Sequence, residues 1–350
     1  MSRILQTSLL RWFDREKRAM PWRGTKDPYR VWLSEVMLQQ TRVETVTRYW
    51  GRFLERFPTV ADLARAGEQE VLKAWEGLGY YRRARHLHQA AREVVERHHG
   101  VVPSDEEAFR ALPGVGDYTA GAVLSIAFGR PLPAVDGNVI RVLCRIYNIE
   151  EDPTRPETAK RIRAIAASLV HRRRAGDWTQ ALMELGATVC LPREPRCLLC
   201  PVAAHCKGRA AGTAARLPAR PKRKAPHRWE HACAVVRRGG KLLFVRRPEE
   251  GLLGGLWELP SGDMSGEPLE EAVPRILAQT TGLSGTYDRE LGRVYHAFTH
   301  ARLTLRVCTV REARGRLSSA RAAWCAPGDV ARLPLSAVAR KSLDLVAGIR

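Results

Sequence analysis

Three features are scarce or missing in this sequence of 350 residues, and each absence narrows what the chain is. No apolar run approaches the roughly 20 residues that a membrane-spanning helix needs. The residues that follow Met1 carry too many charges for a secretory signal. No internal repeat is found, and residues 208–228 form the one tract of biased composition. We therefore expect a cytoplasmic protein that does not use a membrane.

Acidic residues are few relative to basic ones. The chain has 58 Lys and Arg against 37 Asp and Glu, so its formal net charge is +21 at pH 7. Such an excess favours a polyanionic partner such as nucleic acid. An arginine-rich composition without a specific ligand would give the same total, so the net charge alone does not separate the two interpretations.

Disulfides are not expected in a cytoplasmic chain, although eight cysteines are present. Four of them form the run C-x6-C-x2-C-x5-C within 17 residues, namely Cys190, Cys197, Cys200 and Cys206. Four thiolates this close in sequence fit either tetrahedral zinc or a [4Fe-4S] cluster. Zinc sites usually pair their ligands as two C-x2-C knuckles, which this run does not, but the spacing alone leaves both metals open.

The stretch from Leu112 to Asp136 begins with Leu-Pro-Gly-Val-Gly-Asp-Tyr, which predicts a tight turn between two helices. We expect positive φ angles at Gly114 and Gly116 and a second helix from about Asp117. Uncovered amides and a helix N-terminus would suit a phosphodiester. Asp136 follows that helix, so it is either the N-cap of the next helix or a carboxylate that acts on the bound nucleic acid.

Glu35 stands inside an almost wholly apolar segment of a helix that we expect to begin near Pro28. A carboxyl group removed from water has a raised pKa and holds a proton near neutral pH, as a general acid must. The alternative is a glutamate at the exposed edge of a core helix, which is the commoner situation.

Other segments combine aromatic, amide and cationic side chains. Trp22 and Arg23 follow a break in the helical pattern, and Gln40 ends the apolar segment. Tyr80 lies in a glycine-rich turn that precedes three arginines. Aromatic rings interleaved with cations suit a strand whose bases are pushed apart. A helix with a solvated basic face is the alternative.

The pattern changes along the chain from helical to mixed. Residues 208–228 contain seven Lys or Arg, three Pro and no acid, and predict an exposed linker. Beyond it we expect strands over 231–236, 241–245 and 303–310, the first two joined by a hairpin at Gly239-Gly240. A helix is expected over 269–280. This pattern predicts an α/β or α+β domain.

Together, the turn, the aspartate and the four cysteines resemble the helix-hairpin-helix DNA glycosylases with a [4Fe-4S] cluster. The segments at 32–41 (Trp-Leu-Ser-Glu-Val-Met-Leu-Gln-Gln-Thr), 77–81 (Gly-Leu-Gly-Tyr-Tyr) and 135–139 (Val-Asp-Gly-Asn-Val) are similar to the MutY-type adenine DNA glycosylases. The resemblance implies removal of adenine mispaired with 8-oxoguanine or guanine in base excision repair. It also selects iron–sulfur over zinc for the four cysteines.

The resemblance implies a mainly α N-terminal region and an α/β Nudix-like C-terminal domain. The helical DNA glycosylase domain would cover 1–207 in two lobes, with the helix-hairpin-helix at about 105–128 and the cluster loop at 190–206. The Nudix-like 8-oxoguanine recognition domain would cover 229–350. We expect a monomer that binds double-stranded DNA containing A opposite 8-oxoguanine and associates with the nucleoid through that DNA.

The resemblance also implies roles for individual residues. Glu35 would protonate the adenine ring, and Asp136 would stabilise the oxocarbenium-like sugar. Tyr118 and Asn138 would line the site near the sugar. The expected substrate and DNA contacts are Trp22, Arg23 and Leu38 around the extruded base, Gln40 and Tyr80 in the gap left in the duplex, and Gly114 and Gly116 on the backbone.

Two absences refine the expected activity. Bifunctional relatives such as endonuclease III carry a lysine at the position of Tyr118, and a phenol forms no Schiff base, so we expect a monofunctional enzyme. In the C-terminal domain, Phe298, Thr299 and His300 match the loop that reads the lesion. Ile276, Gln279 and Thr280 stand where a Nudix hydrolase carries glutamates, so pyrophosphate hydrolysis is not expected.

Three other activities fit the sequence less well. An endonuclease III-like enzyme for oxidised pyrimidines is disfavoured by Tyr118 and by the extra domain. A damage sensor without catalysis is disfavoured by the presence of Glu35 and Asp136. A pyrophosphatase that acts on the nucleotide pool is disfavoured by the missing glutamates.

Overall fold

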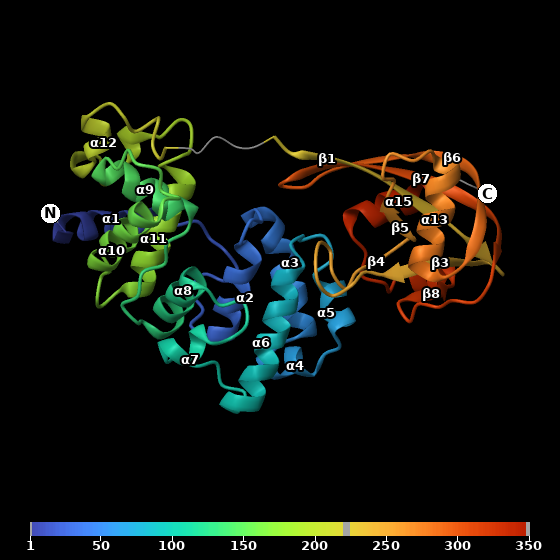
Figure 1. Cartoon of the computed structure of the whole chain (residues 1–350). Coiled ribbons are helices and arrows are strands. Elements are labelled where there is room, and N and C mark those ends of the chain that lie inside the picture. Colours follow the sequence, from blue (N-terminus) through green and yellow to red (C-terminus); the bar gives the residue numbers. More distant parts are fainter. Residues whose placement is uncertain (1, 220–224, 348–350) are drawn as a thin grey trace. The chain divides into compact units, whose positions relative to one another are not determined.

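The computed structural model describes residues 2–219 and 225–347, which fall into two compact units (Figure 1). The helical unit comprises Met1–Arg65 and His86–Arg223, and the C-terminal unit comprises Ala66–Arg85 and Lys224–Arg350. The segment Ala66–Arg85 therefore packs with the C-terminal unit although its neighbours in sequence are helices of the other unit. None of the described helices has both the length and the apolarity needed to cross a bilayer.

The first unit is built almost wholly from helices. They are α1 (Ser2–Glu16), α2 (Pro28–Leu38), α3 (Val43–Arg56), α4 (Val60–Arg65), α6 (Arg82–His98), α7 (Glu106–Arg110), α8 (Asp117–Phe128), α9 (Gly137–Tyr147), α10 (Pro156–Ser168), α11 (Ala175–Thr188) and α12 (Lys207–Ala210). The first turn of α6 lies in the C-terminal unit. Asp27 caps α2, because its carboxylate accepts hydrogen bonds from the amides of Tyr29 and Arg30.

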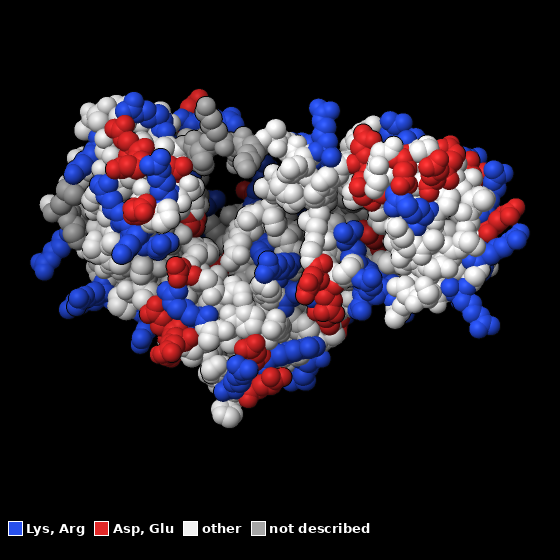
Figure 2. Space-filling view, viewed as in Figure 1, with Lys and Arg blue, Asp and Glu red and all other residues white. Residues whose placement is uncertain are grey.

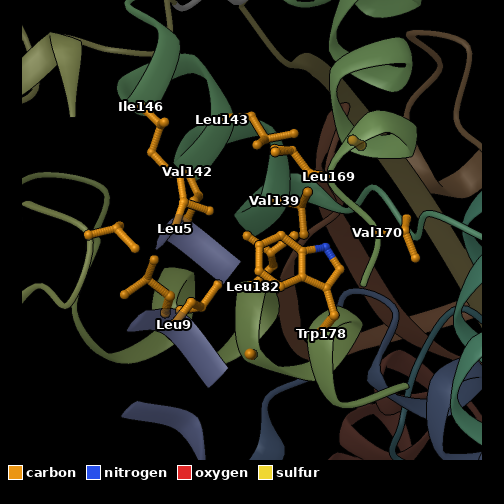
Figure 3. Close-up of a cluster of buried hydrophobic side chains, with 14 of the residues drawn as sticks. Leu5, Leu9, Val139, Val142, Leu143, Ile146, Leu169, Val170, Trp178 and Leu182 are labelled. Atoms are coloured by element: carbon orange, nitrogen blue, oxygen red, sulfur yellow. The ribbon is translucent and has the colours of Figure 1, made fainter. Parts of the chain in front are cut away.

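One core of this unit is shared by α1, α9, α10 and α11 (Figure 3). Leu5 and Leu9 are one helical turn apart and point into the same cluster as Val142 and Leu182. Trp178 from α11 is almost fully buried there. This packing fixes α9, which carries Asn138 and is capped by Asp136, against α11, which ends shortly before Cys190.

The predicted turn joins α7 to α8. Gly114 has φ +76°, and a Cβ built on it would lie 2.7 Å from the Cβ of His86, so glycine is required there for two reasons. Gly116 differs from the prediction, because its φ is −96° and its backbone is extended. It is the N-cap of α8, and extended backbone is usual at that position.

The C-terminal unit contains α5 (Glu68–Ala74), a mixed sheet and an antiparallel sheet. Its strands are β1 (His227–Val235), β2 (Arg237–Arg238), β3 (Lys241–Arg246), β4 (Trp257–Glu258), β5 (Ser261–Asp263), β6 (Ser284–Ala297), β7 (Ala301–Arg314) and β8 (Ala322–Cys325). One sheet has the order β5-β1-β7-β6, with β1 parallel to β7. In the other sheet β3 pairs with β2, β4 and β8.

The predicted hairpin at Gly239-Gly240 is present but joins different strands. It connects β2 to β3, with Arg238 opposite Lys241. Both glycines have positive φ, as a two-residue hairpin turn requires. The expected pairing with 241–245 is therefore wrong for residues 231–235, which belong to β1 in the other sheet. Val236 alone of the expected strand bonds to β3, since its carbonyl accepts a hydrogen bond of 3.1 Å from the amide of Leu243.

Helices cover both faces of β1. Cys233 and Val235 pack in the cluster that includes α15 (Ala337–Ala347), whereas Ala232 and Ala234 pack in the cluster formed by α13 (Leu269–Thr281). The short helix α14 (Pro327–Val330) precedes α15. Side chains alternate along a strand, so neighbouring residues of β1 serve the two layers.

The prediction that residues 208–228 form an exposed linker is wrong for the first part of that range. Thr213, Ala214 and Leu217 are buried in the helical unit, and the Leu217 carbonyl accepts a hydrogen bond from Arg145. Residues 220–224 of the expected linker lie outside the described residues. The strand β1 already begins at His227.

Candidate active site

Glu35 lies in the interior of the helical unit, so the exposed-edge alternative is wrong. The residue is only 5% exposed on α2. Burial raises the pKa of Glu35 to about 7, the hydrogen bond from Tyr118 opposes that rise, and the charge of Asp136 adds to it. A carboxyl group in this state is able to hold or release a proton near neutral pH.

Tyr118 connects the turn after α7 to Glu35. It lies in the first turn of α8, and its hydroxyl donates a hydrogen bond of 2.5 Å to Oε2 of Glu35. Burial and the charges of Glu35 and Asp136 raise the pKa of Tyr118 well above its usual value. The phenol is therefore a neutral donor, and both carboxyl groups act on it from one site.

Asp136 is the N-cap of α9, as one of the two predictions stated. Its Oδ1 accepts a hydrogen bond of 2.7 Å from the amide of Val139. Its Oδ2 accepts one of 2.8 Å from Nδ2 of Asn138. The charge of Asp136 also contributes to the raised pKa of Glu35, so the two carboxyl groups lie within electrostatic range of each other. The two roles of Asp136 are thus compatible.

A chain of hydrogen bonds leads from Asp136 to the cysteine loop. Nη2 of Arg141 donates to Oδ1 of Asn138 at 2.8 Å, and its Nε donates to the carbonyl of Cys190 at 2.7 Å. Gly186 of α11 packs directly on Asn138, because a Cβ built on it would lie 2.5 Å from that residue's Cβ. The position of Asn138 is therefore fixed from two sides.

Arg23 is held by a carboxylate that the sequence did not single out. Its Nη2 lies 3.0 Å from Oε2 of Glu184, which also pairs with Arg18. Glu184 is 2% exposed; burial would raise its pKa, but the two guanidinium groups outweigh burial and lower it. The available signal was an acid on α11 between the apolar residues Leu182 and Leu185.

The remaining predicted base contacts of this unit have varied surroundings. Trp22 is buried edge-on against Trp50, with ring centroids 6.1 Å apart. Leu38 is half-buried at the end of α2. Gln40 has φ +60°, a left-handed conformation that is uncommon for a residue with a side chain. Gln40 thus lies at a constrained turn after the helix.

The four predicted metal ligands line one cavity. Cys190, Cys197, Cys200 and Cys206 surround it together with Arg145. Burial raises the pKa of Cys200 to about 11, and the charges of the other three thiols add to that effect. In the described part of the chain no group of three or more His, Cys, Asp or Glu side chains is arranged to hold a metal ion.

Arg145 is an unusual member of this cavity because its guanidinium is buried and bonds to a thiol and to backbone carbonyls. The residue is 1% exposed. It donates to Sγ of Cys190 at 3.2 Å and to three backbone carbonyls, those of Leu191, Pro192 and Leu217. Among the described residues it forms no ion pair with an acid. A buried cation of this kind calls for negative charge nearby.

In the C-terminal unit the structure brings together two predicted DNA contacts far apart in sequence. Tyr80 is 48% exposed, has φ +47°, and its hydroxyl lies 3.0 Å from Oγ1 of Thr299. Thr299 sits in the loop between β6 and β7. Its neighbours Phe298 and His300 pack against Trp229, with ring centroids at 5.8 and 5.3 Å. This packing fixes the loop.

The helix α13 carries no carboxylate at the three positions considered. Ile276 is buried, Oγ1 of Thr280 donates to the carbonyl of Ile276, and Gln279 bonds to Arg275. Arg275 also pairs with Glu267 at 2.8 Å. These side chains are occupied in packing and local contacts rather than arranged around a cation.

Charges of both signs are spread over the visible face of each unit. Figure 2 shows Lys and Arg side chains interspersed with Asp and Glu. On the visible face of each unit taken by itself, the Lys and Arg side chains do not form one continuous patch.

Comparisons with known proteins agree with this architecture. Residues 33–168 match the model of the HhH-GPD superfamily base excision DNA repair proteins, and residues 231–345 match the NUDIX domain. The chain is 40% identical to the adenine DNA glycosylase of Homo sapiens over 359 residues, which cover 86% of this chain and 65% of that protein. For the Rattus norvegicus adenine DNA glycosylase the identity is also 40%, covering 86% and 69%.

A solved structure shows the same helical fold. A thermostable thymine-DNA glycosylase matches with a TM-score of 0.55 and 29% identity, covering 60% of this chain and 97% of that one. Fold and site thus define a base excision DNA repair protein of the HhH-GPD superfamily with a Nudix-like C-terminal domain. More narrowly, the chain belongs to the family of adenine DNA glycosylases, since it covers 69% of the Rattus norvegicus protein at 40% identity.

Proposed function

We propose that this chain removes adenine from double-stranded DNA by hydrolysing the N-glycosidic bond, and that it prefers adenine opposite 8-oxoguanine. One observation carries the proposal. Tyr118 bonds to Glu35, and the charge of Asp136 acts on both, so a buried acid and a second carboxylate share one site. The names of the relatives support adenine as the base.

The reaction divides between the two carboxyl groups. Glu35 gives its proton to a ring nitrogen of the extruded adenine, which then leaves as a neutral base when its bond to C1′ breaks. Asp136 stabilises the positive charge that develops on the sugar. A water molecule adds its oxygen to C1′ and returns a proton to Glu35. The products are adenine and an abasic site.

Neighbouring groups keep these two roles apart. Tyr118 holds Oε2 of Glu35, and Asn138 with the amide of Val139 holds both oxygens of Asp136. Hydrogen bonds to a carboxylate favour its charged form, whereas burial favours the protonated form of Glu35. The pair thus supplies a proton donor, Glu35, and a second carboxyl group whose two oxygens are fixed by hydrogen-bond donors.

The base opposite the adenine is assigned to the C-terminal unit. Thr299 and Tyr80 present two hydroxyl groups 3.0 Å apart beside the Phe298 loop. Hydroxyl groups donate and accept hydrogen bonds, and the exposed ring of Tyr80 offers a stacking surface. This pairing supports a site that reads 8-oxoguanine.

A duplex assay tests the activity. Oligonucleotides carrying adenine opposite 8-oxoguanine, guanine, cytosine or thymine are incubated with excess protein, and strand cleavage is measured with and without alkali. We expect alkali-dependent cleavage, fastest opposite 8-oxoguanine. Because Tyr118 has no amine to form a Schiff base, we expect no strand cleavage by the enzyme itself. Cleavage that is equal with and without alkali would refute a monofunctional enzyme. Intact strands in every duplex would refute the glycosylase activity.

We also propose that Cys190, Cys197, Cys200 and Cys206 hold a [4Fe-4S] cluster. They line one cavity, and the buried guanidinium of Arg145 supplies a positive charge beside Cys190. When bound, the cluster would tie four points of residues 190–206 into one loop. The residues fit the group, because an anionic cluster would balance a cation that has no carboxylate partner in the described chain.

Metal analysis tests this assignment. Purified protein should contain about four iron atoms per chain and absorb near 400 nm, as expected for four thiolates around one cluster. Cys197→Ser should lower the iron content, whereas Cys233→Ser, at a buried core cysteine of the C-terminal unit, should leave it unchanged. One zinc ion per chain and no iron would contradict the proposal.

A further inference from the structure

The segment Ala66–Arg85 is bound to the rest of the C-terminal unit through polar contacts along its length. At its start, Gln69 donates to the carbonyl of Gly255 at 3.0 Å and accepts from the indole of Trp257 at 2.9 Å. At its end, the hydroxyl of Tyr81 donates to the carbonyl of Leu335 at 3.2 Å. The segment is therefore fastened on both sides of its central turn.

Glu76 carries the charged contact between these two points. Its Oε1 accepts a hydrogen bond of 2.5 Å from Nε of Arg340 on α15, and its Oε2 accepts one of 2.8 Å from Lys73. Lys73 also donates to the carbonyl of Leu333 at 3.0 Å. Burial would raise the pKa of Glu76, but the two cations outweigh burial and lower it. Glu76 is thus an ionised group with two fixed partners.

Glu76 stands at the start of the turn that ends in Tyr80. Gly77 and Gly79 have φ of +98° and +72°, and Tyr80 itself has φ +47°. A left-handed conformation at a tyrosine costs free energy and persists only where the surroundings hold it. The hydroxyl of Tyr81 also accepts a hydrogen bond of 3.2 Å from the amide of Gly77. Contacts on either side of the turn therefore hold Tyr80 in place.

The turn that carries Tyr80 contacts the loop 298–300, which we assign to reading the lesion. Tyr80 meets Thr299 at 3.0 Å only if the turn and the loop between β6 and β7 keep their present distance. Arg340 belongs to α15, which packs in the same apolar cluster as Phe298. The Glu76–Arg340 ion pair and the Tyr80–Thr299 contact thus attach the turn 77–80 to the rest of the C-terminal unit at two places.

We propose that Glu76 is a positioning residue for recognition of the base opposite the adenine. Its pairing with Arg340 fixes the turn 77–80 on the C-terminal unit and so keeps Tyr80 beside Thr299. This inference rests on the proposed function, because it assigns the two hydroxyl groups to 8-oxoguanine. Glu76 belongs to the C-terminal unit, whereas Glu35 and Asp136 belong to the helical unit, so its loss should change discrimination and leave the chemical step intact.

A double-mutant cycle on the ion pair tests the inference. Single-turnover rate constants for adenine release are measured opposite 8-oxoguanine and opposite guanine for the wild type, Glu76→Gln, Arg340→Gln and the double variant. We expect each single variant to lower the ratio of the two rate constants about tenfold, and the double variant to lower it no further. Glu312→Gln is the control, because it removes an exposed ion pair with Arg314 in the same unit.

The outcomes separate the inference from the proposed function. A wild type with no preference for 8-oxoguanine refutes the proposed lesion specificity before the variants are compared. A normal preference in the wild type and in both single variants overturns the role of Glu76. Rate constants that fall equally on both duplexes also overturn it, since they indicate a general structural effect. Thermal melts recorded for every variant verify that the proteins compared are folded.

Discussion

At the scale of single residues, the site depends on opposing effects on Glu35. Burial and Asp136 favour the protonated form, and the hydrogen bond from Tyr118 together with the charge of Arg23 favours the ionised form. Burial is the largest effect, so the pKa of Glu35 rises to about 7. A proton is thus available to the adenine at neutral pH without an acidic environment.

The pH dependence of the rate follows from that pKa. Glu35 must be protonated to act as the acid, so adenine release should be constant below pH 7 and fall about tenfold per pH unit well above it. Single-turnover rates from pH 5.5 to 9 measure this limb. A rate that stays level to pH 9 would assign the proton to another group.

The raised pKa of Glu35 should also make the free energy of unfolding depend on pH. The pKa of Glu35 rises from its usual 4.5 to about 7 on folding, so the contribution of Glu35 to stability is most favourable below pH 4.5, declines up to pH 7 and is level above it. The full shift corresponds to about 3 kcal/mol. Glu35→Gln has no ionisable group at this position, so its free energy of unfolding does not fall in this way. The difference in unfolding free energy between the variant and the wild type should therefore grow in favour of the variant by about 2–3 kcal/mol between pH 5 and pH 8. Urea unfolding at both pH values measures it.

The environment of a residue could be predicted where its neighbours in the sequence determine that environment. The apolar run around Glu35 indicated burial, and the position of Asp136 before an apolar run indicated an N-cap. Glu184 and Arg145 were not predicted, because their partners Arg23 and Cys190 lie 161 and 45 residues away in sequence. Only packing of the helices shows which buried charge meets which partner.

At the scale of elements, the site depends on how closely α9 and α11 approach. Gly186 lets the backbone of α11 lie against Asn138, and Arg141 then reaches the carbonyls of both Gly186 and Cys190 at 2.7 Å. The N-terminus of α9, with its cap Asp136, is positioned by this contact. A methyl group at Gly186 would force the two helices apart.

Gly186→Ala tests the importance of this contact. We expect adenine release to slow about 10- to 100-fold, because a shift of the N-terminus of α9 misplaces Asp136, while DNA affinity changes little. Gly137→Ala is the control, since it also lies on α9 beside Asp136 and a Cβ there meets nothing within 4 Å. If Gly186→Ala matches the control, the helix contact does not position the site.

Elements were predicted better than their pairing. The helices from Pro28, Asp117 and Leu269 begin where expected, because caps, proline and glycine mark their ends in the sequence. The positive φ at Gly116 and the pairing of β1 with β3 were wrong. A glycine permits several conformations, and strand neighbours depend on contacts far along the chain.

At the scale of the whole molecule, the two units are not two consecutive stretches of the chain, and the sequence does not reveal this. The segment Ala66–Arg85 belongs to the C-terminal unit although helices of the other unit flank it. It brings Tyr80 to Thr299 across 219 positions. The pattern around Tyr80 and the family resemblance at Thr299 each predicted a DNA contact, but neither indicated that the two side chains would meet.

Net charge sets an expectation for the whole protein on DNA. With +21 at pH 7, binding should release counterions from the duplex and weaken steeply with salt. We expect the equilibrium constant for an undamaged duplex to fall at least about 100-fold between 50 and 200 mM KCl, measured by fluorescence anisotropy. An affinity that does not change with salt would show that the excess charge is not used on DNA.

The central claim is that Glu35 and Asp136 act on one nucleotide. Single-turnover adenine release opposite 8-oxoguanine, measured for Glu35→Gln, Asp136→Asn and the double variant, tests it most directly. Each single variant should bind the duplex normally and release adenine about 100- to 10,000-fold more slowly, and the double variant should lose less than the product of the two losses. A single variant that releases adenine at the wild-type rate would contradict the account.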